Sequence, residues 1–305
     1  MKVLRQFFYT IFYGNFFYGI AAVLLAMETA AKLPLGRLDW EFYVLLGLGT
    51  TFFYTESYSF DPAPKPGNKR ADWIFKYRRI LMAGQWIMGL LCLALAVSIL
   101  IEYNEAIRQF NIGEWGMAIF FPLAAILYYG LSFPGVFKLN IRQNGFTKPF
   151  VIGMVWTGAV TIYPILMWAL QSGELPDYSW RMLWYFTHNL MFITVLCVLF
   201  DIKDYAADHN ADLKTFVVQH GLRSTIFRFV IPLVVLGICS YLAFWLPREI
   251  PHGRLLTNLI PFFLLLLIAY GMQKRRGILY YLAVIDGMMV AKALLGIASM
   301  LFFPQ

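Results

Sequence analysis

The chain has 305 residues, of which 60% are hydrophobic and only 14% are charged, and its mean hydropathy is +0.64. This composition excludes an ordinary soluble globular domain and predicts a polytopic membrane protein. The net charge of +8 implies no nucleic-acid partner, because the arrangement of Lys and Arg along the chain has a simpler explanation, given below.

Long apolar runs recur along the whole chain. Helices of about eighteen residues or more cross a hydrocarbon layer about 30 Å thick. We therefore expect an all-α fold of nine transmembrane helices, forming one domain over residues 1–305. The predicted spans are 7–30, 40–58, 79–101, 115–133, 149–170, 180–200, 225–246, 255–272 and 278–303.

Two features of these spans argue against a signal peptide and against disulfide or metal-binding cysteines. The first span carries Asn15 but is too long for a signal-peptide core and has no convincing cleavage site, so it is kept as a helix. The cysteines Cys92, Cys197 and Cys239 all fall inside predicted spans. Their positions indicate no disulfide framework and no metal-ligand spacing.

Basic residues are distributed unevenly between the two sides of the predicted bundle. The N-terminus and the loops on its side carry eighteen Lys and Arg residues, whereas the other side carries six. Positive loops stay in the cytoplasm, so we expect a cytoplasmic N-terminus and an external C-terminus. The expected location is the bacterial inner membrane. The six residues are Lys32, Arg37, Arg108, Arg181, Arg248 and Arg254.

Aspartates gather directly after the sixth span, in "FDIKDYAADHNADLKTF" from Phe200 to Phe216. If the helix continues beyond Phe200, these aspartates fall within an arc of about 80°, because each residue advances by about 100°. Like charges on one helix face repel, and a divalent cation removes that penalty. Magnesium suits carboxylate oxygens together with substrate phosphates. The alternative is a solvated acidic helix. The aspartates are Asp201, Asp204, Asp208 and Asp212.

This segment resembles the second aspartate-rich motif of the UbiA superfamily of intramembrane prenyltransferases. The correspondence covers Asp201, Asp204, Asp208, Thr215 and Gly221, while Asp212 stands where the family often has Gly. The family also has nine helices, with acidic motifs after the second and sixth. "YYGLSFPGVFKLNIRQNGFTKPFVIGMVWT" is similar to its basic loop between helices four and five, and "YYLAVIDGMMVAKALL" to its last helix.

The resemblance implies a reaction and its participants. Members of the family transfer a polyprenyl group from its diphosphate to an aromatic, quinone-precursor or other lipid-soluble acceptor, with Mg²⁺ on the diphosphate. Asp201, Asp204 and Asp208 would then be catalytic residues and metal ligands. The lipid bilayer supplies both substrates. The sequence does not indicate the acceptor, the chain length or any protein partner.

The first acidic motif of the family is where this chain departs. The corresponding region reads "TFFYTESYSFDPAP", with Tyr54 near the position of the family's Asn. Glu56 and Asp61 are five residues apart and diverge by about 140° on a helix, so they do not share an ion. Arg70 in this loop, and Lys138 and Arg142 in the loop after the fourth span, are candidate diphosphate ligands. Topology alone explains these cations equally well. Tyr54 and Glu56 are further candidate substrate-binding residues.

Two functions remain open on the sequence. One is an active prenyltransferase with a reduced first motif. The other is a non-catalytic relative that binds a prenyl lipid or serves as a scaffold in a complex. A transporter is a weaker alternative, because its acidic residues would lie near mid-membrane.

Charged and titratable residues inside the spans form a further group. Asp286 and Lys292 are intramembrane charges about 120° apart on a helix, so they are not expected to pair. His188 lies away from the aspartates, and we expect it to be a hydrogen-bonded structural histidine.

Overall fold

The structure is a computed structural model, and it describes residues 2–59, 69–129, 131–133, 137–139, 147–176, 178–205, 215–246, 250–274 and 276–304. The described α-helices are α1 (Lys2–Tyr13), α2 (Phe16–Lys32), α3 (Trp40–Ser59), α4 (Lys69–Glu102), α5 (Asn104–Arg108), α6 (Ile112–Tyr129), α7 (Lys148–Thr157), α8 (Tyr163–Ser172), α9 (Trp180–Asp201), α11 (Phe216–His220), α12 (Leu222–Ser224), α13 (Ile231–Trp245), α14 (His252–Gly271), α15 (Ile278–Tyr280) and α16 (Gly287–Phe302).

Shorter elements join or interrupt these helices. An antiparallel hairpin of β1 (Leu131–Phe133) and β2 (Phe137–Leu139) follows α6, with Ser132 opposite Lys138. The π-helical turns are η2 (Gly158–Ile162), η4 (Thr225–Val230) and η5 (Tyr281–Ile285), and η3 (Ile202–Asp204) is a 3₁₀ turn. Such interruptions of an α-helix are often found beside functional sites.

The fold is that of a multi-pass helical membrane protein. By length and composition, six helical segments of the described chain are able to cross a membrane, or seven if α1 and α2 count as one bent span. These six are Lys69–Glu102, Lys148–Ser172, Trp180–Asp204, Leu222–Trp245, His252–Gly271 and Ile278–Phe302. Helix occurs in each of the nine predicted spans, but α3 is not among the six, and the fourth span (115–133) runs past the end of the shorter α6 into β1.

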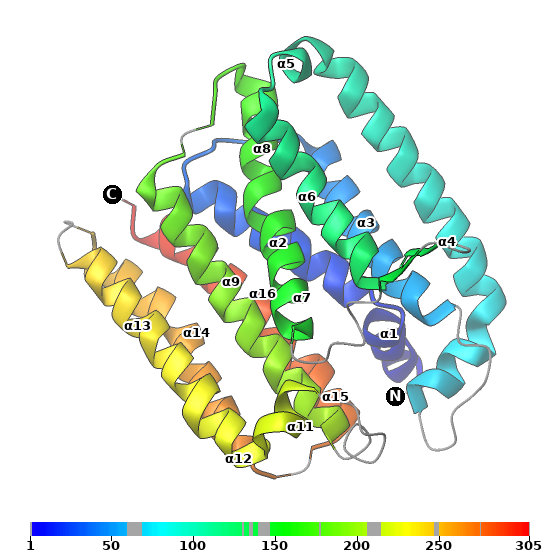
Figure 1. The fold of residues 1–305 in the computed structure, drawn as a ribbon, viewed down its shortest axis with the longest axis vertical. Coiled ribbons are helices and arrows are strands. Elements are labelled where there is room, and N and C mark those ends of the chain that lie inside the picture. Colours follow the sequence, from blue (N-terminus) through cyan, green and yellow to red (C-terminus); the bar gives the residue numbers. More distant parts are fainter. Residues whose placement is uncertain are drawn as a thin grey trace.

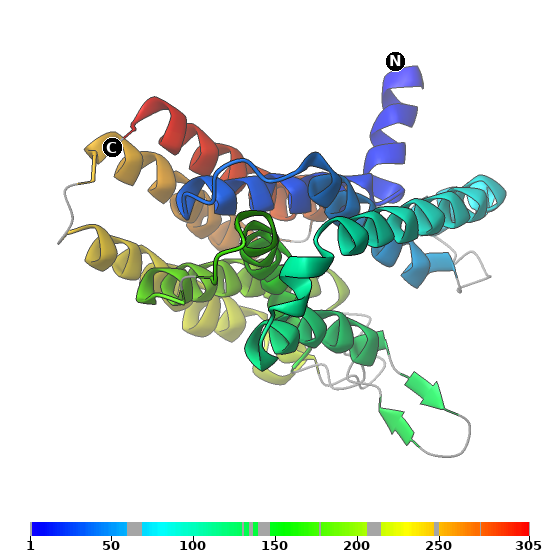
Figure 2. The ribbon, with the colours of Figure 1, turned by 90° about the horizontal axis from the view of Figure 1, so that it is seen from above.

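The first predicted span is not one straight helix. The chain bends by 65° between α1 and α2, where Asn15 adopts a left-handed conformation with φ of 64°. Arg70 Nη2 donates to Asn15 Oδ1 at 2.5 Å, and Asn15 Nδ2 donates to Thr55 Oγ1 at 3.3 Å. Asparagine tolerates this conformation better than most residues, and two buried hydrogen bonds stabilise it here. Figure 2 shows α1 turned out of the bundle.

Helix α4 begins ten residues earlier than the predicted third span. It starts at Lys69, so Arg70 and its basic neighbours lie on the helix and not in a loop. Arg70 itself is buried, whereas Lys69, Lys76 and Arg78 are exposed and reach water from the helix. Figure 1 shows α4 along the periphery, and most of its apolar side chains, such as Trp86 and Leu90, are exposed. An apolar exposed face of this kind suits contact with lipid.

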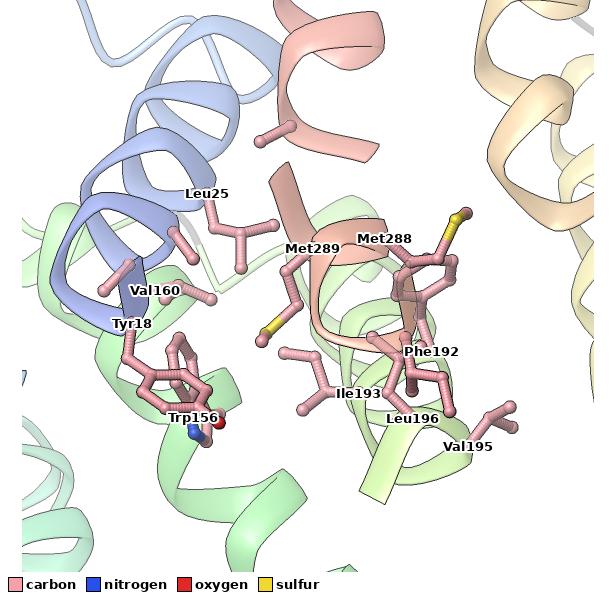
Figure 3. Close-up of a cluster of buried hydrophobic side chains, with 14 of the residues drawn as sticks. Tyr18, Leu25, Trp156, Val160, Phe192, Ile193, Val195, Leu196, Met288 and Met289 are labelled. Atoms are coloured by element: carbon pink, nitrogen blue, oxygen red, sulfur yellow. The ribbon is translucent and has the colours of Figure 1, made fainter. Parts of the chain in front are cut away.

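The core lies where α2, α9, α16 and the segment around η2 meet. Figure 3 shows Leu25 of α2, Val160 of η2, Ile193 of α9 and Met289 of α16 converging on it. Helices α2 and α3 approach closely at Gly19, where an added Cβ would lie 2.5 Å from the carbonyl oxygen of Gly47. Small residues allow this close packing, as is usual between membrane helices.

Candidate functional site: an apolar cavity with a charged end

A cavity of about 620 Å³ lies between α3, α6, α7, α9 and the start of α16. Its wall is largely apolar, with Phe42, Phe53, Phe121, Ile152 and Leu196 among the lining side chains. Charged residues line it as well, and these include Lys148, Asp201, Lys203, Asp204 and Asp286. We refer to this space as the large cavity. An apolar wall with a few polar groups is typical of a small-molecule site.

An ion pair between two helices forms part of the charged lining. Lys148 Nζ, from the first residue of α7, lies 2.6 Å from Asp201 Oδ1, at the last residue of α9. The side chain of Asp201 is 5% exposed and that of Lys148 is 25% exposed. A buried carboxylate requires such a partner, because desolvation without one costs several kcal/mol.

Both charges of this pair lie at helix ends that disfavour them. The N-terminus of a helix carries partial positive charge and the C-terminus partial negative charge, so each end is unfavourable for its residue. Pro149 favours the helix start that places Lys148 there, because proline suits the first turn. Local preference therefore does not explain either charge. The ion pair between α7 and α9 offsets both unfavourable placements.

The predicted acidic stripe requires a helix that continues through residues 201–215, and the described residues do not show one. The α-helix ends at Asp201 and tightens into η3, which contains Asp204. Thr215 is instead the N-cap of a new helix, α11, and accepts a hydrogen bond from the amide of Val218. The α-helical spacing assumed for the stripe therefore does not hold at Asp204, which lies in the 3₁₀ turn. Asp208 and Asp212 lie outside the described residues.

Asp201 and Asp204 both line the large cavity but have different cationic partners. Lys203 Nζ lies 3.3 Å from Asp204 Oδ2, in a pair that is more exposed than the one at Asp201. Among the described residues, no group of three or more His, Cys, Asp or Glu side chains has an arrangement able to hold a metal ion. Each of the two carboxylates therefore forms an ion pair with a lysine that also lines the large cavity.

One observation fits a cation at this position. Asp201 Oδ2 is buried and has no hydrogen-bond partner among the described residues. Carboxylate oxygens are the ligands that Mg²⁺ prefers, together with water and phosphate oxygens. If Mg²⁺ binds, Asp201 Oδ2 and Asp204 are the described groups that would hold it, while Lys148 would face the phosphate.

Aromatic residues from three helices form another part of the lining. Tyr54 stacks on Tyr18 with ring centroids 4.2 Å apart, and its hydroxyl accepts a hydrogen bond from Trp156 Nε1 at 2.6 Å. Tyr18 donates to Asp286 Oδ2 at 2.7 Å. Figure 3 shows Tyr18 and Trp156 side by side. Tyr54 therefore joins a hydrogen-bonded aromatic group in contact with the cavity.

The remaining candidates from the sequence lie elsewhere. Glu56 Oε2 accepts a hydrogen bond from Gln85 Nε2 of α4 at 3.0 Å, and Glu56 does not line the large cavity. Arg70 is buried and stabilises the bend at Asn15. Lys138 lies on β2, and Arg142 is outside the described residues, as is Asp61.

Lys148 is the residue that the sequence interpretation overlooked. It was counted only as one basic residue of a cytoplasmic loop. Its position beside Pro149, at the start of an apolar run, was the available signal, because a helix N-terminus does not favour a cation. The partner across the bundle could not be inferred without the packing of α7 against α9.

Asp286 and Lys292 do not pair with each other, as predicted, but have different partners. Asp286 bonds to Tyr18 at the large cavity, whereas Lys292 Nζ lies 2.7 Å from Glu28 Oε2. The expectation for His188 was wrong, because its Nε2 is buried and has no hydrogen-bond partner among the described residues. Its ring instead contacts those of Trp184 and Phe262, with centroids 5.0 and 4.8 Å away.

Comparisons with protein-family models, with curated proteins and with solved structures found no match to this chain. The resemblance to the UbiA superfamily therefore stays a prediction from the motif around Asp201. The functional argument has to start from the cavity and its charged residues.

Proposed function

We propose that the protein is a membrane prenyltransferase, which moves a polyprenyl group from a prenyl diphosphate to a lipid-soluble acceptor. The observation that supports this proposal is the large cavity, whose lining is mostly apolar but also includes lysines and carboxylates. Such a cavity suits a substrate with a hydrocarbon tail and an ionic head. The UbiA-like motif at Asp201 and Asp204 contributes two of the carboxylates.

The charged residues of the large cavity contribute more to the affinity for a prenyl diphosphate than its apolar residues do. A prenyl tail gains little on moving from lipid into an apolar cavity, because lipid tails are equally apolar. Selection for a diphosphate therefore has to come from charge. Lys148 and Lys203 are the described cations of the cavity, and hydrogen bonds to charged groups contribute about 1.5–3 kcal/mol each.

In the proposed reaction the allylic carbon–oxygen bond breaks and diphosphate leaves with the bonding electrons. The acceptor forms the new bond to the allylic carbon and loses a proton. Mg²⁺, when bound, would neutralise charge on the departing diphosphate. Lys148 would bind the same phosphate oxygens, and the rings of Tyr18, Tyr54 and Trp156 would stabilise positive charge on the allyl group. The apolar wall would exclude water from that cation.

A second candidate function is a non-catalytic membrane subunit that holds a prenyl lipid. The Lys148–Asp201 ion pair favours it, because a carboxylate already paired with lysine is a weaker metal ligand. Glu56 also bonds to Gln85 and does not line the large cavity, so this acidic residue of the first-motif region contributes no carboxylate there.

A direct assay distinguishes the two functions. Purified full-length protein is given Mg²⁺, labelled farnesyl or geranylgeranyl diphosphate, and a panel of aromatic and lipid-phosphate acceptors. We expect acceptor-dependent release of diphosphate, which is lost when the metal is chelated. Tight binding of the prenyl diphosphate without release under any acceptor would contradict the enzyme and support the second candidate.

We further propose that nine spans place Lys148 and Asp201 at the cytoplasmic side of the bacterial inner membrane. The excess of Lys and Arg in the loops on that side supports this orientation. The bent α1–α2 pair, α3 and α6 would complete the nine crossings.

Cysteine labelling tests this orientation. In a chain whose three native cysteines are replaced by serine, Gln219→Cys should react in inverted vesicles only. The matched probe Glu174→Cys, which follows the C-terminal end of α8, should react in right-side-out vesicles only. Both residues are exposed. The reverse pattern, or reaction of both on one side, would exclude the proposed topology.

A further inference from the structure

A second cavity, of about 120 Å³, lies at the other end of α9. We refer to it as the small cavity. Its lining includes Trp184 and His188 of α9, Tyr241 of α13 and Arg254 of α14. His188 and Asp201 are thirteen residues apart on α9, which is roughly 20 Å at 1.5 Å per residue, and the two cavities share no lining residue. It is therefore separate from the site described above.

The small cavity gathers basic residues that topology does not explain. Six Lys and Arg residues occur on the less basic side of the bundle, and three of them line this one cavity. These three are Lys32, Arg181 and Arg254. The positive-inside bias would favour their absence from this side. No Asp or Glu belongs to the described lining.

The carboxylate paired with Lys32 leaves a net positive charge. Glu28 is fully buried, with Lys32 Nζ at 2.6 Å from Oε1 and Lys292 Nζ at 2.7 Å from Oε2. One carboxylate therefore serves two ammonium groups. Neither arginine of the cavity has a carboxylate partner among the described residues. Both donate hydrogen bonds to backbone carbonyls instead.

Both arginines keep donors for a ligand. A guanidinium has five N–H groups. Arg254 donates from Nε and Nη2 to the carbonyl of Phe303, at 3.1 and 2.8 Å. Arg181 donates from Nη2 to the carbonyl of Lys32 at 2.8 Å. These bonds hold the guanidinium groups at the cavity and leave other N–H groups of each arginine available.

His188 gives an independent indication of a ligand. Only 6% of the residue is exposed, it lines the small cavity, and its Nε2 has no hydrogen-bond partner among the described residues. A buried polar atom without a partner is costly, and a bound water or ion is one arrangement that satisfies it. Either tautomer of the ring can bond a phosphate group, as donor to P–O⁻ or as acceptor from P–OH.

We propose that the small cavity binds a phosphate anion, presented by the headgroup of a membrane lipid or free in solution. Arginine is suited to phosphate because its planar fork makes paired hydrogen bonds with two oxygens. Trp184 and Phe244 stack with centroids 4.0 Å apart and form an aromatic wall that suits the membrane interface. The volume is sufficient for a headgroup and not for acyl chains, which would lie in the bilayer.

Lipid titration of the detergent-purified full chain, followed by native mass spectrometry, tests the proposal. Short-chain phosphatidylglycerol should be retained in preference to phosphatidylcholine. Arg181→Gln and Arg254→Gln should each weaken retention tenfold or more. Arg108→Gln is the matched control, since it removes the same charge from the same side at a residue that bonds only to Asn104 among the described residues. It should change retention less than twofold.

The two sources of phosphate are distinguished by competition. If sn-glycerol 3-phosphate or inorganic phosphate displaces the lipid, the site takes free phosphate as well; if neither does, it is a lipid site. Equal retention by wild type, Arg181→Gln and Arg254→Gln would overturn the proposal, and so would an equal loss in Arg108→Gln. Circular dichroism and a single gel-filtration peak establish that Arg181→Gln, at an exposed residue, is folded.

This binding does not depend on the proposed prenyl transfer. Asp201→Asn, at the other end of α9, should retain phosphatidylglycerol like the wild type. The small cavity and the proposed function therefore succeed or fail separately.

Discussion

Asp201→Asn should lower prenyl transfer a hundredfold or more. The substitution keeps the size of the side chain but removes a negative charge from the large cavity, where Asp201 Oδ2 is the carboxylate oxygen available to a cation. Loss of one such electrostatic group costs about 3 kcal/mol in the transition state. Initial rates of diphosphate release at saturating substrate measure the effect.

Glu56→Gln is the matched control for this prediction. It also changes one acid to its amide, but Glu56 bonds to Gln85 and does not line the cavity. We expect a loss of less than fivefold. An equally severe loss in Glu56→Gln would show that a second acidic site takes part. If wild type and both variants bind the prenyl diphosphate tightly but release no diphosphate with any acceptor, the result supports the non-catalytic subunit.

The helices were predictable because apolar length is a strong signal. A run such as 255–272 needs only its composition to indicate a membrane helix, and α14 covers it. The bend at Asn15 was not predictable in the same way. Its left-handed backbone is stabilised by Arg70 and Thr55, which are 55 and 40 residues away in the sequence. Such contacts depend on how α2, α3 and α4 pack.

The candidate site was predictable in part. Asp201 was identified from local spacing, and it does line a cavity. The arrangement of the residues after Asp201 was not predicted, because the expected spacing of 100° per residue holds for an α-helix and the chain forms a 3₁₀ turn at η3. Lys148 was missed for a different reason: the same residue type at a cytoplasmic boundary is expected from topology alone. Its role becomes visible only through the distance to Asp201.

Lys148→Met should raise the apparent KM for the prenyl diphosphate tenfold or more. A charge-assisted hydrogen bond to the diphosphate contributes about 1.5–3 kcal/mol, which corresponds to roughly ten- to a hundredfold. The variant should also be less stable, because it leaves Asp201 buried without its partner. Breaking a buried pair costs about 3–5 kcal/mol, and the partial exposure of Lys148 places the expected loss at or below the lower end of that range.

The double variant Lys148→Met/Asp201→Asn separates binding from stability. With neither charge present, the desolvation penalty disappears, so thermal stability should recover towards that of the wild type. Activity should not recover, because both groups that handle the diphosphate and its metal are gone. Lys203→Met is the matched control for stability: its pair with Asp204 is more exposed, so the change should cost less than about 1 kcal/mol. If Lys148→Met lowers stability but leaves prenyl diphosphate binding unchanged, the ion pair only joins α7 to α9, and the diphosphate has to be bound by other groups.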